Sequence, residues 1–124
     1  MGLFDKRVNY KPFEYPEVLK FTSAINNSFW VHSEVDFTAD TQDFHSHLTP
    51  SERNAVKRAL LAIAQIEVSV KSFWGNLYNH LPKPELNGLG ATFAECEFRH
   101  SEAYSRLVEV LGYNDEFEKL IEVP

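Results

Sequence analysis

Two long segments of this 124-residue sequence carry apolar side chains at intervals of three and four residues, the spacing of one face of an α-helix. The first segment runs from Pro50 to about His80, and its stripe consists of Leu60, Ile63, Glu67, Val70, Trp74 and Leu77. The second ends at Leu111, and its stripe consists of Phe93, Glu97, His100, Tyr104, Val108 and Leu111. No stretch alternates for long enough to build a sheet. The sequence therefore predicts an all-α fold containing a helical hairpin.

Local signals mark where these helices begin and end. The run Thr49-Pro50-Ser51-Glu52 offers a capping residue, a proline at the first helical position and a glutamate three residues after the cap. Between the two helices the chain is expected to break or bend at Pro82, Pro84, Gly88 and Gly90. Gly112 is well placed to stop the second helix. Asn114-Asp115 is typical of a cap, and the helix that it predicts would run through Glu116, Phe117, Leu120 and Ile121.

The predicted organisation is an N-terminal arm over residues 1–49, followed by the hairpin over residues 50–124. The arm mixes prolines with aromatic residues, and one helix is expected in it, from Glu17 to Phe29. The rest of the arm is interpreted as a polar loop. In that loop, His45 and His47 alternate like a pair of metal ligands, but an exposed loop pair is the favoured interpretation.

The charge, hydropathy and cysteine content of the sequence exclude several classes of binding partner and location. The net charge of −6 argues against a nucleic-acid groove and against an anionic membrane surface. No apolar run approaches the roughly 20 residues needed to span a bilayer. Cys96 is the only cysteine, which excludes an internal disulfide, and the chain starts without a secretion signal, so a cytoplasmic location is expected. Beside two glutamates, Cys96 is interpreted as a small core or interface residue rather than a nucleophile.

Three residues in the two stripes can ligate a metal. Glu67 places a carboxylate where a core residue is expected, and burying it without a partner is costly. Glu97 and His100 form a Glu-x-x-His pair, which lets one helical turn present an oxygen and a nitrogen to a metal. That spacing also occurs by chance, as a surface glutamate beside a partly buried histidine. Glu67 on a facing helix and Tyr104 one turn beyond His100 favour the metal-ligand interpretation, and hard carboxylates with imidazole suit iron and manganese.

The run from Ala94 to Tyr104, AECEFRHSEAY, resembles the ligand helix of class I ribonucleotide reductase small subunits. Phe29-Trp30 followed by Glu34-Val35-Asp36 is similar to the aromatic pair and acidic segment of that family. The resemblance implies a ferritin-like four-helix bundle with a dinuclear metal centre. It implies that Glu67 and His100 bind one metal, that Glu97 bridges to the other, that Tyr104 holds a stored radical and that Trp30 lies on the electron path to the subunit surface.

Glu67 departs from the family pattern, because many members have aspartate at this position. Its extra methylene allows chelating or bridging modes, and the resemblance extends to a manganese-using branch, so Mn/Mn, Mn/Fe and Fe/Fe centres all stay open. Lys71, one turn beyond Glu67, is a candidate to pair with a ligand carboxylate or to hydrogen-bond to a bound oxygen species. The alternative is a lysine that extends to solvent. With this ligand set, the oxidising equivalent rests either on Tyr104 or on the metals.

The other half of the family's ligands would lie downstream of Pro124. The chain is therefore expected to be a fragment, to be completed by a separate chain, or to associate with a second copy. The resemblance implies a homodimer of the complete small subunit and a large-subunit partner that binds the nucleotide, in keeping with the lack of a phosphate-binding Gly-rich loop. The alternative function is a ferritin-like metal-storage protein, or an oxidase or N-oxygenase, without reductase output.

Overall fold

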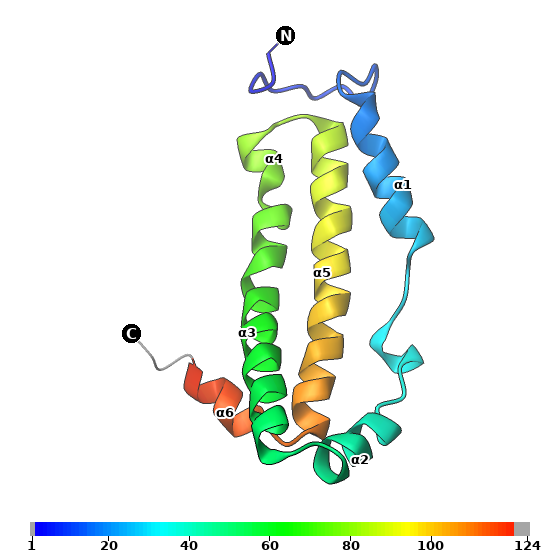
Figure 1. The fold of residues 1–124 in the computed structure, drawn as a ribbon. Coiled ribbons are helices and arrows are strands. Elements are labelled where there is room, and N and C mark those ends of the chain that lie inside the picture. Colours follow the sequence, from blue (N-terminus) through cyan, green and yellow to red (C-terminus); the bar gives the residue numbers. More distant parts are fainter. Residues whose placement is uncertain (1, 121–124) are drawn as a thin grey trace. The chain divides into compact units, whose positions relative to one another are not determined.

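The computed structural model describes residues 2–120, which contain helices and no β-strand, so the all-α prediction is confirmed (Figure 1). In chain order the elements are η1 (Pro16–Val18), α1 (Leu19–Asn27), η2 (His32–Glu34), α2 (Thr38–Ser46), α3 (Pro50–Gly75), α4 (Leu77–His80), α5 (Pro84–Val110) and α6 (Asn114–Lys119). The further helix predicted after Asn114 is α6, and Ile121 lies outside the described residues. None of the described helices is both long enough and apolar enough to cross a membrane.

The start of α3 follows the predicted capping box. The backbone N–H of Thr49 donates to Glu52 Oε2 at 2.7 Å, and the Glu52 N–H donates to Thr49 Oγ1 at 3.3 Å. These two bonds satisfy amide groups that the first helical turn leaves without an intrahelical acceptor. The helix ends earlier than predicted, at Gly75, because Asn76 adopts a turn and its side-chain oxygen accepts a hydrogen bond from Asn79.

The second long helix, α5, corrects the prediction of a bend at Gly88 and Gly90. It begins at Pro84 and contains both glycines without interruption. Gly90 faces the end of α3, where an added Cβ would lie 2.5 Å from the carbonyl oxygen of Trp74. The glycine therefore permits close helix packing rather than breaking the helix. At the other end Gly112 has a φ of +80°, the left-handed conformation of a helix stop, as predicted.

The segment predicted to be a polar loop forms a second helix in the arm, α2. Asp36 Oδ1 accepts hydrogen bonds from the N–H of Thr38 at 3.0 Å and from its hydroxyl at 2.6 Å, which holds the first turn. Phe44 is buried, with 4% of its surface exposed. One buried aromatic side chain and a local acidic contact stabilise a helix that periodicity alone does not reveal. His45 thus lies in the last turn of α2, and exposed His47 follows that helix and contacts Asp43.

The described chain divides into two compact units. The first unit comprises the chain up to Trp30 together with Ser69–Phe98, and the second comprises Val31–Val68 together with the chain from Arg99 onward. In the first unit Trp74 stacks on Phe93 at a ring-centroid distance of 4.4 Å. The buried core of the second unit consists of Phe44, Leu60, Leu61, Ala64, Val108 and Leu111.

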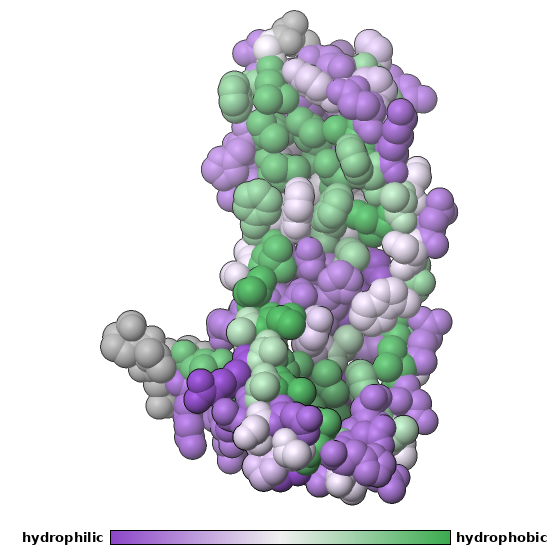
Figure 2. Space-filling model, in the orientation of Figure 1, coloured by the Kyte–Doolittle hydropathy of each residue, from purple (hydrophilic) through white to green (hydrophobic). Residues whose placement is uncertain are grey.

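The core of the second unit corrects one position of the predicted α3 stripe. Leu60 is buried as expected, but Ile63 is 40% exposed, and Leu61 and Ala64 are the residues that pack inward instead. The apolar face of α3 is therefore turned toward Leu61 in this unit. Large apolar side chains remain on the surface, and the space-filling view shows hydrophobic patches among polar ones (Figure 2). The most exposed on α3 and α5 are Ile66, Phe73 and Phe98.

Candidate metal centre

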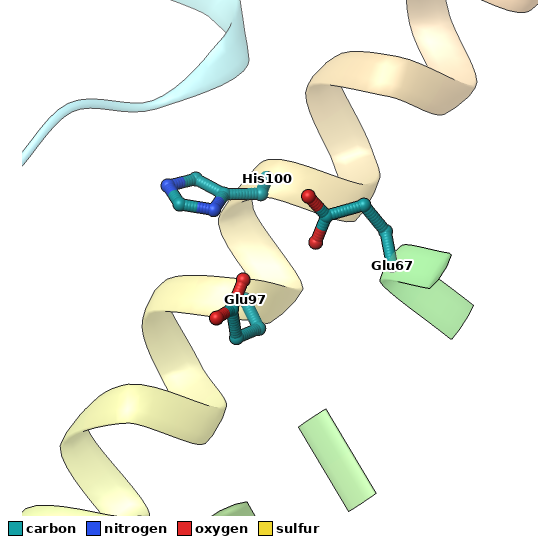
Figure 3. Close-up of side chains that lie close together, drawn as sticks. All are labelled: Glu67, Glu97 and His100. Atoms are coloured by element: carbon teal, nitrogen blue, oxygen red, sulfur yellow. The ribbon is translucent and has the colours of Figure 1, made fainter. Parts of the chain in front are cut away.

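The three predicted ligands lie on the two long helices. Glu67 is on α3, and Glu97 and His100 are one turn apart on α5. Each offers one ligand atom, and these atoms all lie within 4.8 Å of one another (Figure 3). All three residues are half-buried. The structure therefore brings together the residues that the sequence analysis singled out, while their role as ligands stays a prediction.

The donor set fits a hard divalent metal. Two carboxylate oxygens and an imidazole nitrogen are the ligands that iron and manganese take in carboxylate-bridged bundles. Two like charges held close together and partly screened from water repel each other, and a cation between them reverses that repulsion. Figure 3 shows the side chains of Glu67, Glu97 and His100 lying close together. The group is thus chemically suited to half of a dinuclear site.

Tyr104 and Trp30 lie in different settings. Tyr104 follows His100 by one turn of α5, is half-buried, and packs against the apolar core of the second unit. Trp30 is also half-buried and lies between the end of α1 and the start of η2. Lys71 is half-buried on α3, one turn beyond Glu67. Helix spacing places Tyr104 and Lys71 near the ligand positions along their own helices, and the roles of all three stay predictions.

Two groups of charged side chains in contact were not predicted from the sequence. In the second unit, His32 Nδ1 lies 3.4 Å from Glu102 Oε2, with both side chains more than a third exposed. In the first unit, four charged residues form a largely buried cluster, namely Arg7, Glu14, Lys83 and Glu85. A glutamate in the first turn of a helix is an ordinary capping signal. No local spacing could have indicated that the partner of Glu85 is an arginine 78 residues away.

Sequence comparisons place the chain in a known family. The model of the family "Ribonucleotide reductase, small chain" matches residues 7–124. A probable ribonucleoside-diphosphate reductase small subunit of Invertebrate iridescent virus 6 is 34% identical over 113 residues, covering 90% of this chain and 31% of that protein. The ribonucleoside-diphosphate reductase small chain of Nicotiana tabacum is 28% identical over 99 residues, covering 79% of this chain and 30% of that protein.

The ribonucleoside-diphosphate reductase small chain 1 of Saccharomyces cerevisiae is 26% identical over 99 residues, covering 79% of this chain and 25% of that protein. The chain thus spans about a third or less of the length of these relatives. The family match over nearly the whole chain and the helical fold agree with each other. This chain belongs to the ribonucleotide reductase small chain family, whose fold is all-α and ferritin-like.

Proposed function

We propose that this protein acts as the small subunit of a ribonucleoside-diphosphate reductase, and that Glu67, Glu97 and His100 hold metal in its dinuclear centre. The observation that supports this most is the approach of the three donor atoms to within 4.8 Å in a chain of this family. Glu67 and His100 would bind one metal, and Glu97 would bridge to the second. Residues 50–124 would supply half of the four-helix bundle. A downstream half-bundle, in the same or a separate polypeptide, would supply the rest.

In this proposal Tyr104 stores the oxidising equivalent and Trp30 passes electrons toward the subunit surface. The metal pair, when bound, supplies the oxidising power. The stored equivalent would be a neutral tyrosyl radical at Tyr104. Its packing against the apolar core of the second unit supports this role, because apolar neighbours exclude water and reductants from the phenol ring.

We propose a dinuclear centre of manganese, of iron, or of one metal of each kind. Glu67 is long enough to chelate one metal or bridge two, and carboxylate ligands keep manganese a candidate beside iron. Lys71 would pair with a ligand carboxylate beside the metal pair. Metal analysis combined with electron paramagnetic resonance on the intact protein distinguishes the three pairings, because each has a different metal ratio and a different spin state.

The proposed partners are a second copy of the complete small subunit and a large reductase subunit that binds the nucleotide, in a cytoplasmic assembly. The exposed apolar side chains support association, since contiguous apolar surface on a water-exposed face marks interaction sites. No nucleic acid or membrane partner is proposed. Reductase activity on adding a large subunit tests this assembly directly.

Tyr104→Phe tests the proposed radical site. The variant removes only a hydroxyl, so it should fold and load metal like the parent. If Tyr104 carries the radical, reductase activity and the tyrosyl signal should both disappear. Retained activity would place the oxidising equivalent on the metals. A parent protein that binds two metals but never supports nucleotide reduction would instead favour the metal-storage or oxidase alternative.

A further inference from the structure

Four charged side chains connect the N-terminal arm to the start of α5 in the first unit. The guanidinium of Arg7 contacts both carboxylate oxygens of Glu85, with Nη1 lying 3.2 Å from Oε1, and also contacts Glu14 Oε1 at 3.3 Å. Lys83 Nζ donates to the other oxygen of Glu14 at 3.0 Å. The side chains of Arg7, Lys83 and Glu85 are 5%, 0% and 0% exposed. We call these four residues the arm latch.

The backbone of the arm is bound at the same place. The N–H of Arg7 donates to the carbonyl oxygen of Pro82 at 3.1 Å. The N–H groups of Glu14 and Tyr15 donate to Glu85 Oε1 at 2.8 and 3.0 Å. Residues 7–15 are therefore bound at both ends, by Pro82 just before α5 and by Glu85 in its first turn. Figure 1 shows the arm crossing that end of the hairpin.

The charges of the arm latch compensate one another within the chain. Burial would raise the pKa of Glu85, but the hydrogen bonds from Arg7 and from the Tyr15 and Glu14 amides outweigh it and lower the pKa to about 2. The hydrogen bond from Lys83 is the main cause that lowers the pKa of Glu14. Two cations and two carboxylates give no net charge, so the cluster needs no ion or ligand to complete it.

The arm latch lies directly before the helical segment of the arm. Tyr15, bound to Glu85 through its amide, accepts a hydrogen bond at its carbonyl oxygen from the Val18 N–H at 3.3 Å. From there η1 continues directly into α1, which ends at Asn27, only three residues before Trp30. Continuous helical structure transmits position better than a flexible linker of the same length. The arm latch therefore lies at the start of the helical segment that leads to Trp30.

We infer that Arg7, Glu14, Lys83 and Glu85 are positioning residues that dock the arm on the start of α5 and thereby orient the segment that carries Trp30. The docking follows from the contacts themselves, while its relevance to electron transfer through Trp30 rests on the proposed function. Undocking of the arm would leave the core of the second unit folded, because none of the latch residues belongs to that core.

Amide hydrogen exchange on the intact protein tests the docking. Glu85→Ala removes the acceptor of the Glu14 and Tyr15 amides, so faster exchange at those two is expected in any case. The decisive amide is that of Arg7, whose acceptor is the backbone of Pro82. In Glu85→Ala its exchange should accelerate by roughly a hundredfold or more, while the amides near Leu60 keep their protection. An Arg7 amide as protected as in the parent would overturn the inference.

Two further variants keep the test decisive. Glu109→Gln is the matched control, since it breaks an exposed ion pair with Arg106 on the same helix and should leave every arm amide unchanged. If Glu85→Ala does not fold, Lys83→Met removes the other buried cation at similar volume. It should accelerate exchange of the Arg7 amide, and an unchanged rate there would contradict the role of the cluster.

The orientation of Trp30 has its own readout. With Trp74→Phe as background, Trp30 is the only tryptophan, and Glu85→Ala should shift its fluorescence emission to longer wavelength. Unchanged emission would show that the docked arm does not position Trp30, and would overturn that part of the inference. A failure of the proposed function would give a different result. The parent protein would then lack metal and the tyrosyl signal, while its Arg7 amide stayed protected.

Discussion

Two places on α5 hold carboxylates away from bulk water, and they differ in the groups that lie beside the carboxylate. At its first turn, Glu85 is contacted by Arg7 and by two backbone N–H groups. Near its middle, Glu97 meets Glu67 and His100, an arrangement in which two carboxylates lie together with one imidazole. The first arrangement is complete as a structural ion pair. The second has the composition of a metal-binding group.

The difference shows why burial of an acidic residue does not by itself identify a functional site. A carboxylate that faces a guanidinium and amide donors is satisfied by the fold, and its removal is expected to cost stability. Carboxylates that face one another make a site where a cation lowers the free energy, and their removal is expected to cost binding. Substitutions at the two places should therefore change different measurements.

The largest expected effect is the loss of metal from the ligand group. Glu67→Ala and His100→Ala should each lower the metal affinity of the intact protein by about 100-fold or more, because in the proposed centre each residue donates an atom directly to the metal. Metal content after dialysis measures the loss. Folding without metal should change little, since each substitution also removes the cost of burying an ionisable group. Glu109→Gln is the control, and full occupancy in either alanine variant would exclude that residue as a ligand.

The second effect is a dependence of stability on acid pH that originates at Glu85. Its pKa is about 2 in the folded protein, against an ordinary value of 4.5. Because the pKa of Glu85 is lower in the folded than in the unfolded protein, the ionised carboxylate stabilises the fold above pH 4.5. This stabilisation is lost as the pH falls toward 2. Protonation leaves Arg7 with a weakened partner, and we expect a loss of about 3 kcal/mol across this range.

Denaturant unfolding at a series of pH values measures this loss. Glu85→Gln cannot ionise, so it should be less stable at neutral pH and should lack this part of the pH dependence. Glu109→Gln should retain it. A parent protein and a Glu85→Gln variant with parallel stability curves between pH 4.5 and 2 would show that the arm latch does not stabilise the fold through this carboxylate.

The smallest effect concerns two glycines of α5 that involve neither charge nor metal. Gly90→Ala would place a Cβ 2.5 Å from the Trp74 carbonyl oxygen and 3.0 Å from Leu77 Cβ, so the free energy of unfolding should fall by about 1–3 kcal/mol. Gly88→Ala meets nothing within 4 Å and should gain about 0.5–1 kcal/mol from better helix propensity. Equal changes at the two positions would contradict the close approach of α3 and α5 at Gly90.

Local patterns in the sequence were sufficient to predict several elements. The capping box of Thr49 and Glu52, the stop at Gly112 and the two long helices were all predicted, because each depends on contacts between residues a few positions apart. The spacing of Glu97 and His100 belongs to the same class, since one helical turn relates the two side chains. Helix α2 was missed because its stabilisation comes from the burial of Phe44 rather than from periodicity.

The sequence by itself determined the all-α class, the start of α3 at its capping box, the stop at Gly112 and the face of α5 that carries Glu97 and His100. Only the tertiary structure decided that Gly90 lies within an unbroken helix and permits its close packing against the end of α3. It also decided that Leu61 and Ala64 rather than Ile63 enter the core. The pairing of Arg7 with a glutamate 78 residues away was likewise visible only in the structure. The physical reason is the range of the interactions. Hydrogen bonds within a turn are encoded by neighbouring residues, whereas helix packing and buried ion pairs depend on which distant segments meet, and no local spacing specifies that.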